Sequence, residues 1–107
     1  MNRRDFLRIS AFGAAVLTVP AREDAAAHPD LLAVLGPEPV RAIGALYRRL
    51  VPTENNPLVL RAAILAPRMS IGAMVRRDFE MGRTVLVNGW VLAATEARQC
   101  ALFSLLT

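Results

Sequence analysis

The dipeptide Asn88-Gly89 separates two runs of residues that favour β-structure, residues 84–87 and 90–93. Asn-Gly between two such runs is the strongest short-range signal for a β-hairpin, because glycine adopts a positive φ without steric cost and asparagine tolerates one. A two-stranded hairpin is at best marginally stable in water, so it must pack against other elements of the chain. The sequence therefore predicts one β-hairpin, at about 84–93, held against a helical body.

The segment from residue 30 to residue 52 has the spacing of helices. Pro37-Glu38-Pro39 places proline and an acid where a first helical turn favours them, and Pro52 ends the segment. A short helix that begins after Asp30 and ends at Gly36 is expected just before it. In the longer helix the apolar residues fall on one face, and they are Val40, Ile43, Tyr47, Leu50 and Val51.

Two further helices are predicted between residue 56 and the hairpin. Asn56 is a good N-cap with proline after it, and the helix at 58–65 is apolar nearly all round, so we expect it at the centre of the domain or against another chain. Ser70 is the predicted N-cap of a helix at 71–81, with Gly82 just past its end. Its predicted apolar stripe consists of Ile71, Met74, Val75 and Phe79.

After the hairpin, Thr95 is the predicted N-cap of a final helix from residue 96 to about 106. The fold class is therefore mainly α, with three or four short helices and one β-hairpin before the C-terminal helix. The length of 107 residues allows one domain at most. Within it, residues 22–36 are interpreted as a polar, alanine-rich lead-in with the short helix, and residues 37–107 as a small helical domain with the hairpin.

The composition contains more apolar residues than a small domain can bury. Hydrophobic residues make up 54% of the chain and its mean hydropathy is +0.36. A domain of this size buries only about 60% of the surface that its unfolded chain exposes. Apolar residues left over are usually shared with a partner, so the composition favours an interaction protein.

The positive charge does not favour a nucleic-acid partner. All 13 basic residues are arginines, and the formal net charge is +4. Nucleic-acid binding needs a clustered basic face, commonly with aromatic platforms. Here Arg48-Arg49 and Arg76-Arg77 are isolated pairs on predicted helix faces, and aromatic residues are few. We expect these arginines to be solvated and no nucleic acid to bind.

The residues that usually carry chemistry do not form a recognisable constellation. His28 is the only histidine, and a metal site generally needs three or four ligands. Cys100 is the only cysteine and is interpreted as a small buried residue. Asp78 and Glu80 are two residues apart on a helix and do not face each other, while Glu96 suits the first turn of the last helix. We therefore expect no catalytic residues, no metal and no cofactor.

Trp90, beside the predicted turn, is the best candidate for a contact residue. A tryptophan next to a hairpin turn can cover the helices beneath it or fill a pocket on a partner. The first alternative places Trp90 in the core, and the second makes it a contact point for another protein.

The N-terminus contains Arg3-Arg4, then Phe6-Leu7, then Arg8, followed by an apolar stretch at 9–19. That stretch is shorter than the roughly 20 residues that span a membrane, and glycine, serine and alanine dilute its hydrophobicity. The pattern resembles a bacterial twin-arginine export signal. An ordinary secretory signal with two chance arginines is the alternative.

The resemblance implies that the chain crosses the inner membrane already folded, with the twin-arginine translocase and signal peptidase as partners. Val19 and Ala21 supply small residues at the two positions that the peptidase recognises, so residues 1–21 are the expected leader. Residue 27 is an alternative end. The implied location is the periplasm, with membrane contact only through the signal segment. A protein anchored in the inner membrane by an uncleaved leader is the alternative.

Two functional classes follow. The first is a non-catalytic small subunit or escort that carries a larger periplasmic enzyme, for example a redox enzyme, through the export pathway. In its leader and size the chain resembles the small subunits of periplasmic flavin-dependent sugar or alcohol dehydrogenases. The second is a free-standing secreted protein that binds a ligand or the envelope. The segment 78–98 resembles the C-terminal part of small uncharacterised exported proteins, a resemblance that implies no activity.

Overall fold

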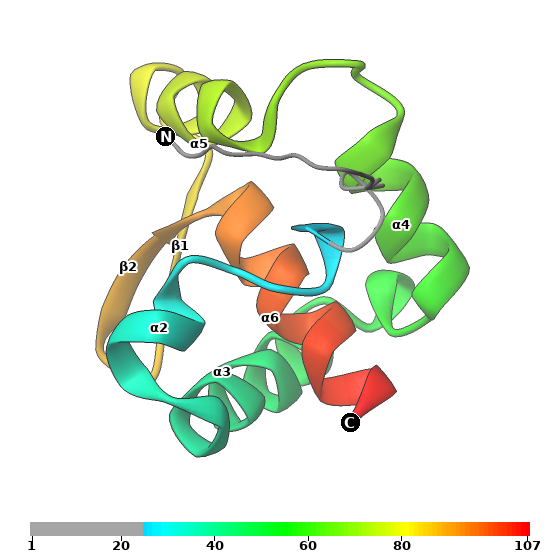
Figure 1. The fold of residues 1–107 in the computed structure, drawn as a ribbon, viewed down its shortest axis with the longest axis vertical. Coiled ribbons are helices and arrows are strands. Elements are labelled where there is room, and N and C mark those ends of the chain that lie inside the picture. Colours follow the sequence, from blue (N-terminus) through cyan, green and yellow to red (C-terminus); the bar gives the residue numbers. More distant parts are fainter. Residues whose placement is uncertain (1–24) are drawn as a thin grey trace, which may run out of the picture.

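The computed structural model describes residues 25–107, and the predicted export-signal and cleavage residues lie outside this part of the chain. Those residues are Arg3, Arg4, Phe6, Leu7, Arg8, Val19 and Ala21. The elements follow in the order α2 (Leu31–Leu35), α3 (Pro37–Leu50), the single 3-10 turn η3 (Pro52–Glu54), α4 (Pro57–Leu65), α5 (Ile71–Glu80), β1 (Thr84–Val87), β2 (Trp90–Ala93) and α6 (Ala94–Leu106). The predicted fold class is confirmed: the structure is mainly helical, with a hairpin before the last helix (Figure 1).

Helix α6 lies at the centre of the molecule. In Figure 1 it runs through the middle, and α3, α4 and α5 each contact it. The contact with α3 is closest at Gly44, where a β-carbon would collide with the backbone of Cys100. The buried residues of α6 occupy most of its circumference and are Thr95, Ala97, Gln99, Cys100, Ala101, Leu102 and Phe103.

Helix α4 does not occupy the centre, although its sequence is apolar nearly all round. Its buried residues are Leu60 and Ile64. Leu58 is 75% exposed and Val59 is also exposed. The expectation that this helix is central is therefore wrong, because only the face toward α6 is covered. Its other predicted role, contact with another chain, stays a prediction.

Two of the predicted helix caps are confirmed. Asn56 Oδ1 accepts hydrogen bonds from the backbone N–H groups of Leu58 and Val59, at 2.8 and 3.3 Å. Ser70 Oγ accepts one from Ala73 N–H at 3.1 Å. Each bond satisfies a donor that a helix start leaves without an intrahelical partner.

The predicted cap of α6 is wrong. The helix begins at Ala94, so Thr95 lies inside its first turn, and its side chain is buried. The start of α6 is stabilised instead by Asp78 of α5, which accepts a bond from Thr95 N–H, and by Glu96, which accepts one from Ala93 N–H at 3.0 Å. One helix thus caps another.

The hairpin forms as predicted. Strands β1 and β2 are antiparallel, with Val87 opposite Trp90 and Leu86 opposite Val91. Asn88 and Gly89 have φ angles of 52° and 81°, the positive values that a two-residue turn of type I′ requires. Val87 and Leu92 are buried, while Leu86 and Val91 are exposed on the other face.

The core contains residues from nearly every element, and it includes two alanines from the start of the described chain. Ala26 and Ala27 are buried with Val40, Ile43 and Leu102. Gln99 Nε2 donates a hydrogen bond of 2.7 Å to the Ala25 carbonyl. The segment that precedes α2 is therefore packed on α3 and α6 as part of the same core.

Helix α5 differs in its buried face from the predicted stripe. Met74 and Asp78 are its buried residues, and Phe79 is 49% exposed. Met74 and the partly buried Ile71 agree with the predicted stripe, but Asp78, which bonds to the start of α6, is buried where Phe79 was expected. Among residues 25–107, no helix is long and apolar enough to span a membrane.

Candidate functional site

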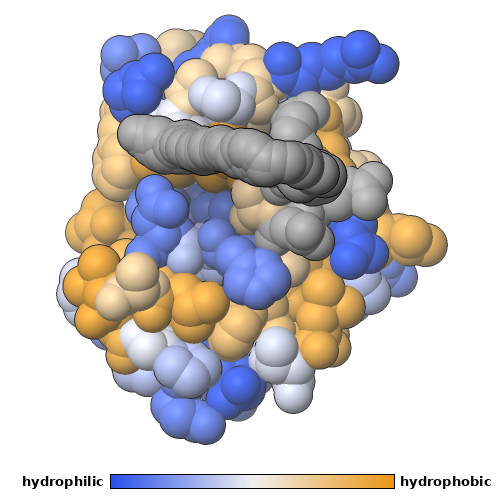
Figure 2. All heavy atoms as spheres, in the orientation of Figure 1, coloured by the Kyte–Doolittle hydropathy of each residue, from blue (hydrophilic) through white to orange (hydrophobic). Residues whose placement is uncertain are grey.

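The outer face of the hairpin exposes apolar side chains. Leu86 and Val91 are cross-strand neighbours, and they are 68% and 62% exposed. Directly opposed residues on one face of an antiparallel pair have β-carbons about 5 Å apart, so the two side chains form one continuous apolar area. We call this pair the hairpin surface. Trp90 stands opposite Val87, so its side chain belongs to the other face of the hairpin, the face that carries the buried Val87 and Leu92. Figure 2 shows apolar side chains along the left edge of the molecule, where the hairpin lies.

Trp90 does not lie in the core. It is 42% exposed and stands opposite Val87, whose side chain is buried. Trp90 is therefore not part of the buried core, but it lies on the inward face of the hairpin, so covering the helices beneath it and contact with a partner both stay predictions. A half-exposed tryptophan is a residue type that interfaces favour, although the register places Trp90 on the other face from Leu86 and Val91.

Other large apolar side chains are exposed across the described chain, which agrees with the surplus expected from composition. They are Val34, Leu50, Leu58, Val59, Phe79, Met81 and Leu106. The hairpin differs from these because three such side chains, those of Leu86, Trp90 and Val91, lie within six consecutive residues. It is thus the most concentrated exposed apolar feature that the backbone holds in place.

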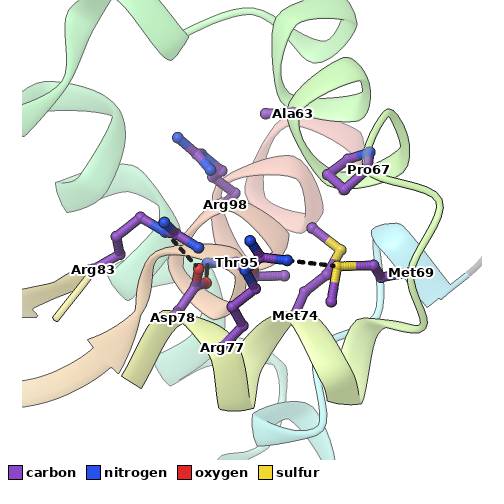
Figure 3. Close-up of a pocket in the computed structure, with 9 residues that line it drawn as sticks. All are labelled: Ala63, Pro67, Met69, Met74, Arg77, Asp78, Arg83, Thr95 and Arg98. Carbon is purple, nitrogen blue, oxygen red and sulfur yellow. Dashed lines mark hydrogen bonds and ion pairs between the residues drawn. The ribbon is translucent and has the colours of Figure 1, made fainter. Parts of the chain in front are cut away.

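A second feature is a cleft of about 370 Å³ between α4 and α5, with α6 at its base. We call it the arginine cleft. Its apolar wall consists of Ala63, Pro67, Met69 and Met74, and its polar wall consists of Arg77, Asp78, Arg83, Thr95 and Arg98 (Figure 3). No sequence pattern predicted it, because its walls come from segments that are distant in the chain.

Asp78 is the buried carboxylate of this cleft. Its Oδ2 accepts a hydrogen bond of 2.8 Å from Thr95 N–H, and its Oδ1 lies 3.2 Å from Arg83 Nε. Burial alone would raise the pKa of Asp78, but the bonds from Thr95 and the charge of Arg83 outweigh it, so the pKa is lowered. Asp78 is therefore an anion at neutral pH, and it joins α5 to the turn before β1 and to the start of α6. This structural role leaves it poorly suited to act as a base.

Glu54 and Arg98, which lines the cleft, form a second and only partly buried ion pair. Arg98 Nε and Nη2 donate to the two carboxylate oxygens of Glu54 at 2.9 and 3.1 Å, and Tyr47 donates its hydroxyl to Glu54 at 2.9 Å. The Arg98 bonds lower the pKa of Glu54, and burial together with Glu54 raises the pKa of Tyr47 to about 12. These bonds tie η3 and α3 to α6.

Arg77 differs from the other two arginines of the cleft. The only polar contact that the structure shows for its guanidinium within residues 25–107 is one of 3.9 Å to the sulfur of Met69. Arg83 and Arg98, by contrast, each bind a carboxylate. Arg77 is thus the cationic group of the cleft that no described carboxylate neutralises.

The remaining residues considered from sequence do not gather into a site. Cys100 is buried as predicted, and burial, followed by the charge of Glu96, raises its pKa to about 12, so it stays a thiol. His28 is exposed, with its ring edge-on to Phe103 at 6.3 Å between centroids. Within residues 25–107 no three His, Cys, Asp or Glu side chains are placed to hold a metal ion.

Sequence reasoning missed the role of Asp78, although a signal was present. Ile71, Met74 and Asp78 have the spacing of one helical face, so a carboxylate interrupts the stripe that packs on α6. A charged residue in such a position usually binds a buried donor.

Comparison of the chain with protein-family models, with curated proteins and with solved structures found no match.

Proposed function

We propose that this chain is a non-catalytic small subunit or escort of a larger periplasmic enzyme, exported in the folded state through the twin-arginine pathway. The observation that carries the proposal is the hairpin surface. Burying apolar area stabilises a complex by about 25 cal/mol per Å² before the costs of association are subtracted, and tryptophan is among the residues that contribute most to interfaces. Leu86 and Val91 offer such area on the outer face of a hairpin whose backbone the turn holds in place, and Trp90 adds exposed area on the other face.

The Arg3-Arg4 pattern supports the export part of the proposal. A folded escort that bears the signal can carry an enzyme that has none, provided that the two associate before export. The buried Asp78 and the partly buried Glu54 are both engaged in holding elements together. A binding role therefore suits the described domain better than catalysis does.

Packing at the start of the domain favours cleavage after Ala21 over cleavage after residue 27. Ala26 and Ala27 belong to the core, and Gln99 bonds to the Ala25 carbonyl. Cutting after Ala27 would remove two buried side chains and leave the Gln99 amide without this acceptor, a cost of about 1–3 kcal/mol for the amide alone. Intact mass measurement of the periplasmic protein should find Arg22 at the new N-terminus. A protein that begins at His28 would contradict this.

The export role is tested by changing Arg3 and Arg4 together to lysine in the native host and comparing the periplasmic proteins of the two strains. We expect this chain and one larger protein without a signal of its own to disappear from the periplasm together and to accumulate in the cytoplasm. Re-expression of the unchanged chain should restore both. If this chain disappears and every other periplasmic protein stays at its normal level, the escort function is wrong.

The arginine cleft favours a second candidate, a free-standing secreted binding protein. A concave site that combines an apolar wall with a few polar groups is the usual form of a small-molecule site. On this alternative, loss of export would change the location of this chain alone.

A further inference from the structure

We propose that the arginine cleft binds a small organic carboxylate with an apolar body, held by its carboxylate at Arg77 and by its body against the α4 side of the cleft. The proposal does not depend on the escort function, because the cleft and the hairpin surface are formed by different residues.

The charge balance of the cleft favours an anion. Three guanidinium groups line it, and they face a single lining carboxylate, Asp78. Asp78 already accepts bonds from Thr95 and Arg83, and the Glu54 pair neutralises Arg98. This leaves the charge of Arg77 without a described counter-ion. Arg77 lies at the edge of a concave and partly apolar space, where solvent screens its attraction for a ligand anion less than on an open surface.

The donors left over match a carboxylate. Arginine carries five N–H donors in a planar fork that binds two carboxylate oxygens at once. Arg83 uses its Nε on Asp78, and Arg98 uses Nε and Nη2 on Glu54, so terminal N–H groups of both remain for a ligand. Figure 3 shows the Arg77 guanidinium directed across the cleft toward Met69. A change of side-chain rotamer from this position would let the guanidinium bind an anion in the cleft.

The apolar wall of the cleft indicates what kind of body the ligand has besides its carboxylate. Ala63, Pro67, Met69 and Met74 present no charged group, and methionine adapts its unbranched chain to the shape of an apolar ligand. A volume of about 370 Å³ is at the small end of the roughly 300–1,000 Å³ of ligand pockets. The cleft thus fits a molecule with one carboxylate and a compact aliphatic or aromatic body, and it offers little to inorganic phosphate beyond charge.

Calorimetric titration of the purified full-length chain at fixed ionic strength tests the proposal. The probes are hexanoate, benzoate and 4-phenylbutyrate, with benzamide as the uncharged analogue and acetate and inorganic phosphate as anions without an apolar body. We expect at least one of the three larger carboxylates to bind saturably, at least tenfold more tightly than benzamide, acetate and phosphate. Absence of saturable binding by all three, or equal binding of benzamide or phosphate, would overturn the proposal.

Variants separate the cleft from general attraction to a positive protein. Arg77→Gln should weaken carboxylate binding at least tenfold. Arg76→Gln removes the same charge from the neighbouring, exposed position outside the cleft and should leave binding within twofold of the unchanged protein. Both side chains are exposed, so both variants should fold, which thermal melting by circular dichroism checks. Equal losses in the two variants would show that net charge, and not the cleft, attracts the ligand.

Discussion

Helix α6 and the hairpin that precedes it are both rich in apolar residues, but the fold buries them to different extents. Seven residues of α6 are buried, including polar ones such as Thr95 and Gln99. The hairpin buries Val87 and Leu92 and leaves Leu86, Trp90 and Val91 exposed. The hydrophobicity of an element therefore does not decide its burial, whereas its position among the other helices does. We infer that α6 determines stability and that the outer face of the hairpin determines binding.

The largest effect is expected where α3 meets α6. Gly44→Ala would place a β-carbon against the Cys100 carbonyl, and backbone cannot move aside as a flexible side chain can. We expect a loss of about 4 kcal/mol or more in the free energy of unfolding, measured by urea denaturation. The control is Gly72→Ala in α5, where the added carbon has space and should stabilise by about 0.5–1 kcal/mol. Similar behaviour of the two variants would contradict the close packing of α6.

The next effect comes from the apolar interior of α6. Leu102 is fully buried, so Leu102→Ala should leave a cavity and destabilise the protein by about 3 kcal/mol. Leu106→Ala, at the exposed end of the same helix, should cost less than about 1 kcal/mol. Denaturation of the two variants under the same conditions checks the difference, and equal losses would mean that α6 is not the centre of the core.

A smaller effect is expected from the carboxylate that caps α6. Asp78→Asn keeps the shape but removes the charge, and it should cost about 2 kcal/mol at neutral pH. The pKa of Asp78 is lowered in the folded state, so its contribution is present above the unfolded value of about 3.9 and is lost as the pH falls through the folded value. The difference between the two proteins should thus shrink below about pH 4. A difference that does not change with pH would show that the charge of Asp78 contributes nothing, and Glu80→Gln is the exposed control.

Local signals in the sequence predicted much of the fold. Asn88-Gly89 predicted the hairpin, and Asn56 and Ser70 predicted their caps, because each depends on residues within a few positions. The cap of α6 and the burial of Asp78 could not be predicted in this way, since they depend on a contact between residues 17 positions apart. The exposure of Phe79 follows from that same contact.

The binding features were predictable to different degrees. Composition predicted an apolar surplus, and the turn drew attention to Trp90, but only the register shows that Leu86 and Val91 share the exposed face. The arginine cleft had no local signal, because Arg77, Arg83 and Arg98 come together only when α5, the turn before β1 and α6 pack.

The smallest effect on stability should come from the hairpin surface. Leu86→Ser with Val91→Ser changes two exposed side chains and should shift the free energy of unfolding by less than about 1 kcal/mol, whereas it removes the large apolar side chains of the hairpin surface. A loss comparable to that of Leu102→Ala would mean that these residues belong to the core after all.

The same double variant gives the most direct test of the account. In the native host, the amount of the proposed larger partner that purifies with this chain should be compared between the unchanged protein, Leu86→Ser with Val91→Ser, and Leu106→Ala, the exposed control at the end of α6. We expect the hairpin variant to reach the periplasm in normal amount and to retain less than about a tenth of its partner, as the loss of a hot spot of at least 1.4 kcal/mol implies, and the control to retain all of it. Full retention of the partner by the hairpin variant would contradict the central claim.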